Sequence, residues 1–301
     1  MSTASPAPTG GARPARLRVG IVSAGRVGAA LGAALSRAGH DVVAASAVST
    51  MSVRRSQLML PGVPLLPPDE VVAVADFVVL AVPDDALRSL VTGLATTQTW
   101  RPGQLVAHTS GAHGIDVLDP AAARGVVALA LHPVMTFAGR AEDIDRLTGA
   151  SWGVTATDDM RPVAEALVIE MGGEPVWVPE SARPLYHAAL TIGSNHLVTL
   201  VNDALSLLAA AGVEQPARLV APLLSASLDN VLRLGDAALT GPVSRGDTAT
   251  VAAHVHTIAA QAPEALAAYV AMALRTAERA ESAGQLDPAQ ANAIRRALEH
   301  E

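Results

Sequence analysis

The chain contains no cysteine and no lysine, and each absence removes a class of chemistry. Without cysteine there are no disulfides, no thiolate metal ligands and no cysteine nucleophile. All 21 basic residues are arginine, so no lysine can serve as a catalytic acid. Aromatic residues make up only 2% of the chain, which means that its cores must be built mainly from alanine, valine and leucine.

Basic stripes and long hydrophobic runs are also missing. The formal net charge of −7 excludes nucleic acid and anionic membrane surfaces as natural partners. The apolar run at 71–82 is broken by Asp76 and is shorter than the ~20 residues that a spanning helix needs. Residues 1–14 lack the apolar core of a signal peptide, so we expect a disordered tail and a cytoplasmic protein.

The first part of the chain alternates short apolar runs with helical patterns. Near-continuous apolar runs of this kind are typical of a parallel sheet that is covered on both faces. Strands are predicted at 17–23, 41–45, 77–82, 104–108 and 126–131, with helices at 25–39, 53–59 and 84–94. A further strand near Trp152, a helix at 160–171 and a strand at 175–178 complete this part.

From residue 181 onward only helical patterns follow. They cover 183–211, 216–234, 248–259 and 263–283, with a last helix beginning at Asp287 and Pro288. We therefore predict a tail at 1–14, a dinucleotide-binding domain at 15–180 and a helical substrate and dimerisation domain at 181–301. The fold class is an α/β Rossmann-type doubly wound parallel sheet followed by an all-α C-terminal domain.

The first strand is followed by a glycine-containing turn that opens a helix. The dinucleotide fingerprint G-x-G-x-x-G occurs between a strand and a helix, and here its second and third glycines are present while Ser23 replaces the first. The alternative is tight helix packing alone. We predict that the pyrophosphate of a dinucleotide is held by Ser23, Ala24, Gly25, Arg26, Val27 and Gly28.

The end of the second strand decides which dinucleotide fits. An acidic residue there would hold the ribose hydroxyls of NAD, but the chain offers none. Ser46 and Ser49, followed by Arg54 and Arg55, instead suit a 2′-phosphate, so NADP(H) is favoured. An ordinary solvated helix start is the alternative for the arginine pair.

Polar residues follow three later strands, and ligands of doubly wound sheets bind at these carboxyl ends. We expect Val82, Pro83, Asp84 and Ser110 to border the cofactor and His132 to face the substrate. The alternatives are a helix start at Asp84, a plain turn at Ser110 and a buried, hydrogen-bonded histidine at position 132.

The motifs SAGRVG, AVPDD, HTSG, LHPVMTF, RPLYHAALTIGSNHLVTL and LTGPVSRGD occur in this order. In this the chain resembles a family of bacterial Rossmann-like proteins whose C-terminal half is classed as domain of unknown function 2520. It is more distantly similar to ketopantoate reductase, pyrroline-5-carboxylate reductase and the β-hydroxyacid dehydrogenases, with a helical domain like that of 6-phosphogluconate dehydrogenase. The resemblance implies a nicotinamide cofactor, a cleft between the domains and a homodimer joined through the helical domain.

The resemblance also exposes a departure. The β-hydroxyacid dehydrogenases and ketopantoate reductase use a helix lysine with an asparagine one turn later. If Asn195 corresponds to that asparagine, the lysine position holds Thr191. Histidine has a pKa suited to proton donation, so we expect His187 to replace the lysine, with Ser194 and Asn195 beside it and Tyr186 as an alternative donor. The other interpretation is that these side chains hydrogen-bond across packed helices.

A loop between later helices carries Arg245, which can clamp a substrate carboxylate or merely pair with an acid. His254 follows on the next helix and is expected to point the same way. His254 and His256 do not share a helix face, which argues against a metal site.

We therefore expect an NADP(H)-dependent oxidoreductase that reduces the carbonyl or imine of a small carboxylate-bearing metabolite. The alternatives are a dinucleotide-binding sensor or scaffold without hydride chemistry, a ketopantoate reductase-like enzyme and a deazaflavin-linked oxidoreductase.

Overall fold

The computed structural model of this chain describes residues 16–299, so the predicted tail at 1–14 lies outside the described residues. By its internal contacts the chain divides into two compact units, Met1–Ile192 and Gly193–Glu301. The division falls within the helical stretch that begins at Arg183, whereas the sequence pattern places the boundary near Glu180.

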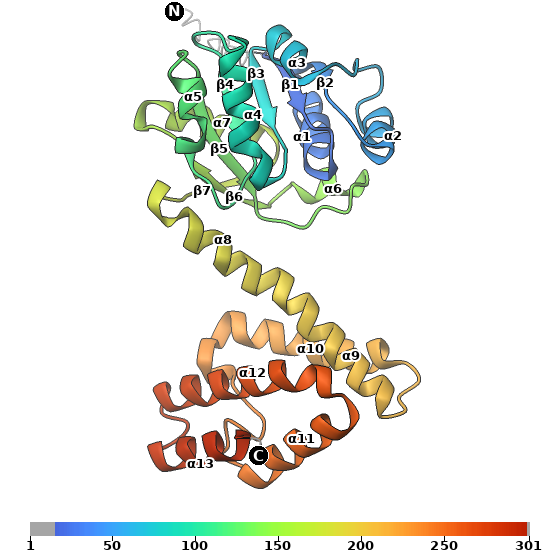
Figure 1. The fold of residues 1–301 in the computed structure, drawn as a ribbon, viewed down its shortest axis with the longest axis vertical. Coiled ribbons are helices and arrows are strands. Elements are labelled where there is room, and N and C mark those ends of the chain that lie inside the picture. Colours follow the sequence, from blue (N-terminus) through green and yellow to red (C-terminus); the bar gives the residue numbers. More distant parts are fainter. Residues whose placement is uncertain (1–15, 300–301) are drawn as a thin grey trace, which may run out of the picture. The chain divides into compact units, whose positions relative to one another are not determined.

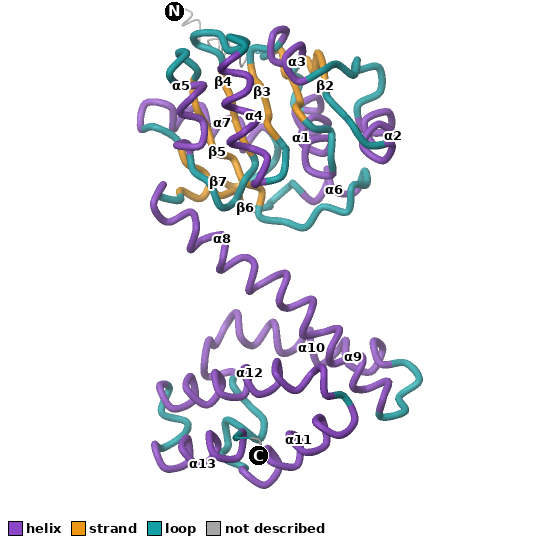
Figure 2. The backbone as a smooth tube through the Cα atoms, in the orientation of Figure 1, coloured by secondary structure: helices purple, strands orange, loops and turns teal. Residues whose placement is uncertain are grey.

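The first unit is built on a seven-stranded sheet in the order β2-β1-β3-β4-β5-β6-β7 (Figures 1 and 2). Its strands are β1 Arg18–Val22, β2 Asp41–Ala45, β3 Phe77–Leu80, β4 Leu105–His108, β5 Val127–Pro133, β6 Ser151–Thr155 and β7 Glu174–Trp177. Its helices are α1 Arg26–Arg37, α2 Thr50–Met59, α3 Pro68–Val74, α4 Asp84–Thr96, α5 Asp119–Ala122, α6 Glu142–Arg146, α7 Arg161–Glu170 and α8 Arg183–Thr191. The predicted Rossmann-type α/β fold is confirmed.

Both faces of the sheet carry a core, and Figure 1 shows α4 and α7 on opposite sides. One core packs α1, α6 and α7 against the strands and includes Leu31, Trp152 and Leu167. The other packs α3 and α4 against the opposite face and includes Val71 and Leu87. Leucine, valine and alanine dominate both cores, as the scarcity of aromatic residues requires.

One strand pair departs from the predicted parallel arrangement. β5 and β6 are antiparallel, whereas the other neighbouring pairs are parallel. The segment between them contains only the short helix α6, which contacts α1, and does not carry the chain back across the sheet. β6 therefore begins at the edge where β5 ended.

The sequence pattern also misses α3. The apolar run at 71–82 divides into the end of this helix and the strand β3, with Ala75 and Asp76 between them. Pro68 at the first turn and the acids Asp69 and Glu70 explain why a helix starts there.

The second unit is helical and consists of α9 Leu197–Ala210, α10 Pro216–Leu234, α11 Thr248–Gln261, α12 Pro263–Ser282 and α13 Pro288–Leu298. The predicted continuous helix at 183–211 is instead α8, a π-helical turn Ile192–His196 and α9. Asp287 caps α13 as expected, in a reciprocal capping box with Gln290.

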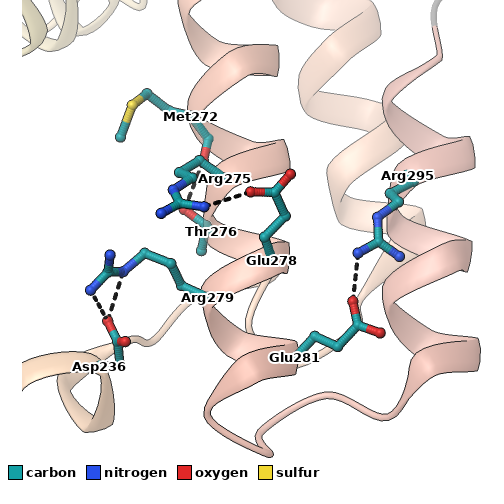
Figure 3. Close-up of polar contacts among 8 residues, drawn as sticks. All are labelled: Asp236, Met272, Arg275, Thr276, Glu278, Arg279, Glu281 and Arg295. Carbon is teal, nitrogen blue, oxygen red and sulfur yellow. Dashed lines mark hydrogen bonds and ion pairs between the residues drawn. The ribbon is translucent and has the colours of Figure 1, made fainter.

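The core of this unit lies among α11, α12 and α13 and includes Val251, Ala277 and Ile294. Figure 3 shows ion pairs at its edge, where Arg279 binds Asp236 and Arg295 of α13 binds Glu281 of α12. α9 contributes no buried residue and α10 only Val220, so both helices keep an apolar face exposed. No helix within residues 16–299 combines the length and the hydropathy needed to cross a membrane.

Candidate functional site

The turn between β1 and α1 keeps a shape that glycine would normally provide. Ser23 stands there at φ +75°, in the left-handed region that L side chains seldom occupy. Ser46 holds it: its hydroxyl accepts the Ser23 amide at 2.8 Å, and its carbonyl accepts the Ala24 amide at 2.7 Å. Ser46 is buried, so its observed role is to anchor this turn from the end of β2.

The two glycines of the turn have the separate roles that the fingerprint implies. A Cβ at Gly28 would lie 2.2 Å from the carbonyl oxygen of Ser23, so only glycine permits this close approach of helix and turn. A Cβ at Gly25 would meet only the Ser23 hydroxyl, at 3.6 Å, and Gly25 caps α1 without a side-chain hydrogen bond. The first amides of α1, starting at Arg26 and Val27, have no acceptor within the helix and lie at the positive end of its dipole, which is an arrangement that suits an anion.

A group of arginines lies near the end of β2. Arg54 and Arg55 belong to α2, and the Arg55 Nε donates to the carbonyl of Gly139 at 3.4 Å. A Cβ at Gly139 would also lie 3.1 Å from the Arg26 side chain, so both arginines meet at this loop. Among residues 16–299, no ion pair joins Arg26, Arg54 or Arg55 to a carboxylate.

Asp143, which the sequence did not reveal, fixes this loop. Its buried carboxylate accepts the amides of Ala138 at 3.2 Å, Gly139 at 2.6 Å and Arg140 at 3.2 Å. The loop is thereby held against Arg55 although it follows β5, three strands away from β1. Only the topology brings these segments together, and no sequence spacing signals it.

The loop after β4 is stabilised by its own polar groups. His108 is fully buried, with Nε2 2.7 Å from the carbonyl oxygen of Gly114 and Nδ1 accepting the Ser110 amide at 3.2 Å. Burial, above all, lowers the pKa of His108 to about 3, so the ring is neutral. The Ser110 hydroxyl accepts the His113 amide at 3.2 Å, so this side chain shapes the loop.

Tyr186 and His187 of α8 meet His132 of β5 beside this loop. The Tyr186 hydroxyl lies 2.8 Å from His132 Nδ1, and the rings of His132 and His187 meet edge-on with centroids 6.3 Å apart. Among the described residues, the one side-chain hydrogen bond at His187 goes from Thr191 to its backbone carbonyl, which leaves the ring nitrogens free for a ligand. The structure thus brings together three predicted site residues.

Two glycines make room for this cluster. A Cβ at Gly111 would lie 2.7 Å from the His187 ring and 3.0 Å from His132 Nε2. A Cβ at Gly153, directly opposite His132 in the β5–β6 pair, would lie 2.3 Å from the Tyr186 hydroxyl. Neither glycine is predicted from the sequence as a site residue, although Gly111 falls in the HTSG motif.

The electrostatic environment keeps the pair of Tyr186 and His132 neutral. Burial and then the charge of Arg183 lower the pKa of His132 to about 4, against a smaller raising effect of Asp84. Burial raises the pKa of the Tyr186 phenol, and Arg183 and the Gly153 backbone oppose that rise. Asp84 is the first residue of α4 and follows Val82 and Pro83 after the end of β3. Its negative charge therefore acts on His132 from that strand end.

Arg183 is the residue that sequence reasoning missed most clearly. It precedes a proline at the start of α8 and looks like an ordinary solvated helix start, yet its exposure is 0%. The signal would have been tertiary, because the polar acceptors that surround it come from separate strands.

The remaining predicted residues belong to the second unit. Ser194 and Asn195 lie in the π-helical turn, a feature that is frequent at functional sites. His254 Nδ1 lies 2.9 Å from the Tyr269 hydroxyl. Hydrogen bonds from Thr250, and then the charges of Arg245 and His254, lower the pKa of Asp247, which caps α11. Within residues 16–299, no three acidic or histidine side chains gather as a metal site.

Comparisons with known proteins agree with this architecture. A Rossmann-like domain model matches residues 3–133, and a model of the domain of unknown function DUF2520 matches residues 150–276. A search of curated proteins finds no match.

Solved structures share the fold at low sequence identity. A Bacteroides fragilis protein assigned as an NADP oxidoreductase is 19% identical, with a TM-score of 0.71 over 87% of this chain and 98% of that one. An imine reductase variant from Myxococcus stipitatus, solved with NAD⁺, is 16% identical, with a TM-score of 0.61 over 95% and 100%. Pyrroline carboxylate reductase from Plasmodium falciparum, solved with NADP, is 12% identical, with a TM-score of 0.54 over 94% and 98%.

Proposed function

The chain belongs to the Rossmann-like proteins that carry the DUF2520 domain, and from this premise we propose that it is an NADP(H)-dependent oxidoreductase. Its substrate is a small carboxylate-bearing metabolite with a carbonyl or imine group. One observation carries the proposal: the turn after β1 and His132 near the end of β5 lie at the carboxyl ends of parallel strands in one sheet, and Tyr186 of α8 lies within hydrogen-bond distance of His132 there. Ligands of doubly wound sheets bind along this edge.

The residues present fit a dinucleotide. The amides at the start of α1 suit the pyrophosphate, and Gly25 leaves the space for it. Arg54 and Arg55, which have no carboxylate partner among residues 16–299, suit a 2′-phosphate, and no acid at the end of β2 is present to hold ribose hydroxyls. The names of similar structures include NADP, and one includes NAD⁺, which supports a nicotinamide cofactor.

Nicotinamide, when bound, supplies the hydride, and the protein must supply a proton to the heteroatom of the substrate. We assign this proton to His187, whose ring nitrogens are free, with Tyr186 as the alternative donor. Neutral His132 orients the Tyr186 hydroxyl. In the second unit we propose Ser194 and Asn195 as catalytic residues, and Arg245 and His254 as substrate-binding residues.

The cofactor assignment is tested by titrating NADPH and NADH while nicotinamide fluorescence is followed. We expect micromolar binding with a preference for NADPH. The Arg54→Ala variant, which leaves the Arg55 bond to the Gly139 carbonyl in place, loses about tenfold or more in NADPH affinity while NADH affinity is unchanged, because a 2′-phosphate contact is removed. Arg88→Ala on the exposed part of α4 is the matched control. Equal affinity for both dinucleotides would contradict the assignment.

The proton donor is tested by NADPH oxidation with a panel of keto acids and cyclic imino acids. We expect His187→Gln to lower turnover by about a hundredfold or more with unchanged NADPH binding. Exposed His256→Gln on α11 is the control. If Tyr186→Phe has this effect and His187→Gln has none, Tyr186 is the donor. NADPH binding without turnover of any compound favours a second candidate, a dinucleotide sensor, which the absence of lysine supports.

The proposal includes a homodimer formed through the helical unit. Leu223, Leu228 and Leu232 of α10 are 65%, 52% and 77% exposed, and a groove of about 680 Å³ beside them is lined by α9, α10 and Arg279. A second copy would cover these side chains. Sedimentation should give a dimer that Leu228→Glu dissociates and that Leu58→Glu, on α2, leaves intact. A monomeric parent protein would refute the dimer.

A cytoplasmic location stays a prediction.

A further inference from the structure

Arg183 is a fully buried cation that has only neutral partners. Its guanidinium donates to Thr155 Oγ1 at 2.8 Å, to the carbonyls of Ala130 and Gly153 at 3.1 Å each, and to the carbonyl of Ser110 at 3.4 Å. Among residues 16–299, no carboxylate lies within ion-pair distance of it. The nearest opposing charge is that of Glu180, which acts on Arg183 without forming an ion pair. An arginine that makes no ion pair is costly to bury, so a role beyond packing is expected of it.

The four acceptors lie around the proposed donor cluster. Ser110 belongs to the loop after β4, Ala130 to β5 and Gly153 to β6, so one side chain ties three separate segments together. Gly153 is the residue opposite His132, and it is also the position over which the Tyr186 hydroxyl lies. The guanidinium is 5.7 Å from the centroid of the Tyr186 ring, one helical turn along α8.

The charge of Arg183 is therefore placed where it acts on two titrating groups. It opposes the burial that raises the pKa of the Tyr186 phenol, and it lowers the pKa of His132 further. A neutral His132 can accept the phenol proton through Nδ1, and a nearby cation favours the phenolate that remains after proton loss. The other charged or titratable groups that face the pair are Asp84, His187 and His108.

We propose that Arg183 is the positioning residue of the proposed site, holding Tyr186 and His132 in hydrogen-bonding register and making the Tyr186 hydroxyl a better proton donor. This inference rests on the proposed function for its purpose. What it predicts is the acidity of the Tyr186 hydroxyl, which can be measured without any substrate.

The chain allows a direct test because it has only two tyrosines. In a Tyr269→Phe background, Tyr186 is the single phenol, and its ionisation can be followed by near-ultraviolet absorbance against pH. We expect Arg183→Met to raise the apparent pKa of Tyr186 by about one unit or more. Arg161→Met is the matched control, because Arg161 also stacks on an aromatic ring, that of Trp177, at 4.3 Å, whereas the charge that acts on Tyr186 is that of Arg183. An unchanged Tyr186 pKa in folded Arg183→Met overturns the proposal.

A cooperative unfolding transition must first show that the Arg183→Met variant folds. If it does not fold, Arg183→Lys decides, because an ammonium keeps the charge but has three donors in place of the planar fork of five that reaches all four acceptors. We then expect the ¹⁵N signal of His132 Nδ1 to move toward its position in Tyr186→Phe, whereas an unmoved signal overturns the proposal. Neither readout uses NADPH or substrate, so a failure of the reductase hypothesis leaves these outcomes interpretable on their own.

Discussion

At the scale of single residues, Ser23 shows how a sequence can depart from a fingerprint and keep its geometry. A left-handed backbone at serine is less favourable than at glycine, and it persists because Ser46 accepts the Ser23 amide from the neighbouring strand end. From the sequence we expect Ser46 to contact a 2′-phosphate. Its observed contacts show a structural role, because its hydroxyl and its carbonyl both accept amides of the turn.

We therefore predict that Ser46→Ala leaves the Ser23 amide without a partner. The expected result is a loss of about 1–3 kcal/mol in the free energy of unfolding, together with weaker binding of both NADPH and NADH. Urea denaturation and nicotinamide fluorescence measure the two effects. Ser89→Ala on α4 is the control, because that hydroxyl is exposed and bonds only within its own helix. Weakened NADPH binding alone would instead support a direct 2′-phosphate contact.

At the scale of elements, β6 creates the space for the proposed donor cluster. Its glycine at position 153 faces the Tyr186 hydroxyl, and a methyl group there would stand 2.3 Å from it. We predict that Gly153→Ala displaces Tyr186 from His132 and lowers the free energy of unfolding by about 1–3 kcal/mol, as overpacking does. Urea denaturation measures the loss, and a shift of the His132 Nδ1 signal reports the displacement.

Gly93→Ala is the contrasting substitution. Gly93 lies within α4, is exposed, and a Cβ there meets nothing within 4 Å. Helix propensity alone then acts, and the free energy of unfolding should rise by up to about 1 kcal/mol. If both substitutions stabilise the protein equally, Gly153 has no steric role and the packing described for Tyr186 is wrong.

The sequence predicts the helices and strands better than it predicts which residues of different helices and strands come into contact. Apolar periodicity and capping residues locate α1, β2 and α10. The strand-end rule selects His132, the resemblance to enzymes with a helix lysine selects His187 and Tyr186, and the three side chains do meet. The reversed direction of β6 is not readable, because it depends on a connection that fails to cross the sheet. Arg183 and Asp143 are missed for the same reason: their partners lie on other elements, and only tertiary structure places them.

At the scale of the whole molecule, two neutral histidines link stability to pH. The pKa of His108 is about 3 and that of His132 about 4 in the folded chain, against 6.5 for an unperturbed histidine, and burial is the main cause of both shifts. Above pH 6.5 both states carry neutral rings. Below pH 6.5 the two histidines bind protons in the unfolded chain, whereas in the folded chain they do not until pH 3–4. The free energy of unfolding must therefore fall as the pH drops through this window.

We predict that the free energy of unfolding falls by about 2 kcal/mol for each histidine between pH 7 and pH 5, because the unfolded rings become almost fully protonated there. Urea denaturation at the two pH values, followed by the fluorescence of the three tryptophans, which all lie in the first unit, measures this difference. The control is His108→Gln/His132→Asn, in which neutral amides replace the ring nitrogens that make the described hydrogen bonds. The pH dependence of this variant should be smaller by nearly the whole amount. If parent and variant lose stability equally on acidification, the two rings are not held neutral, and the electrostatic account of the cluster beside Arg183 fails with them.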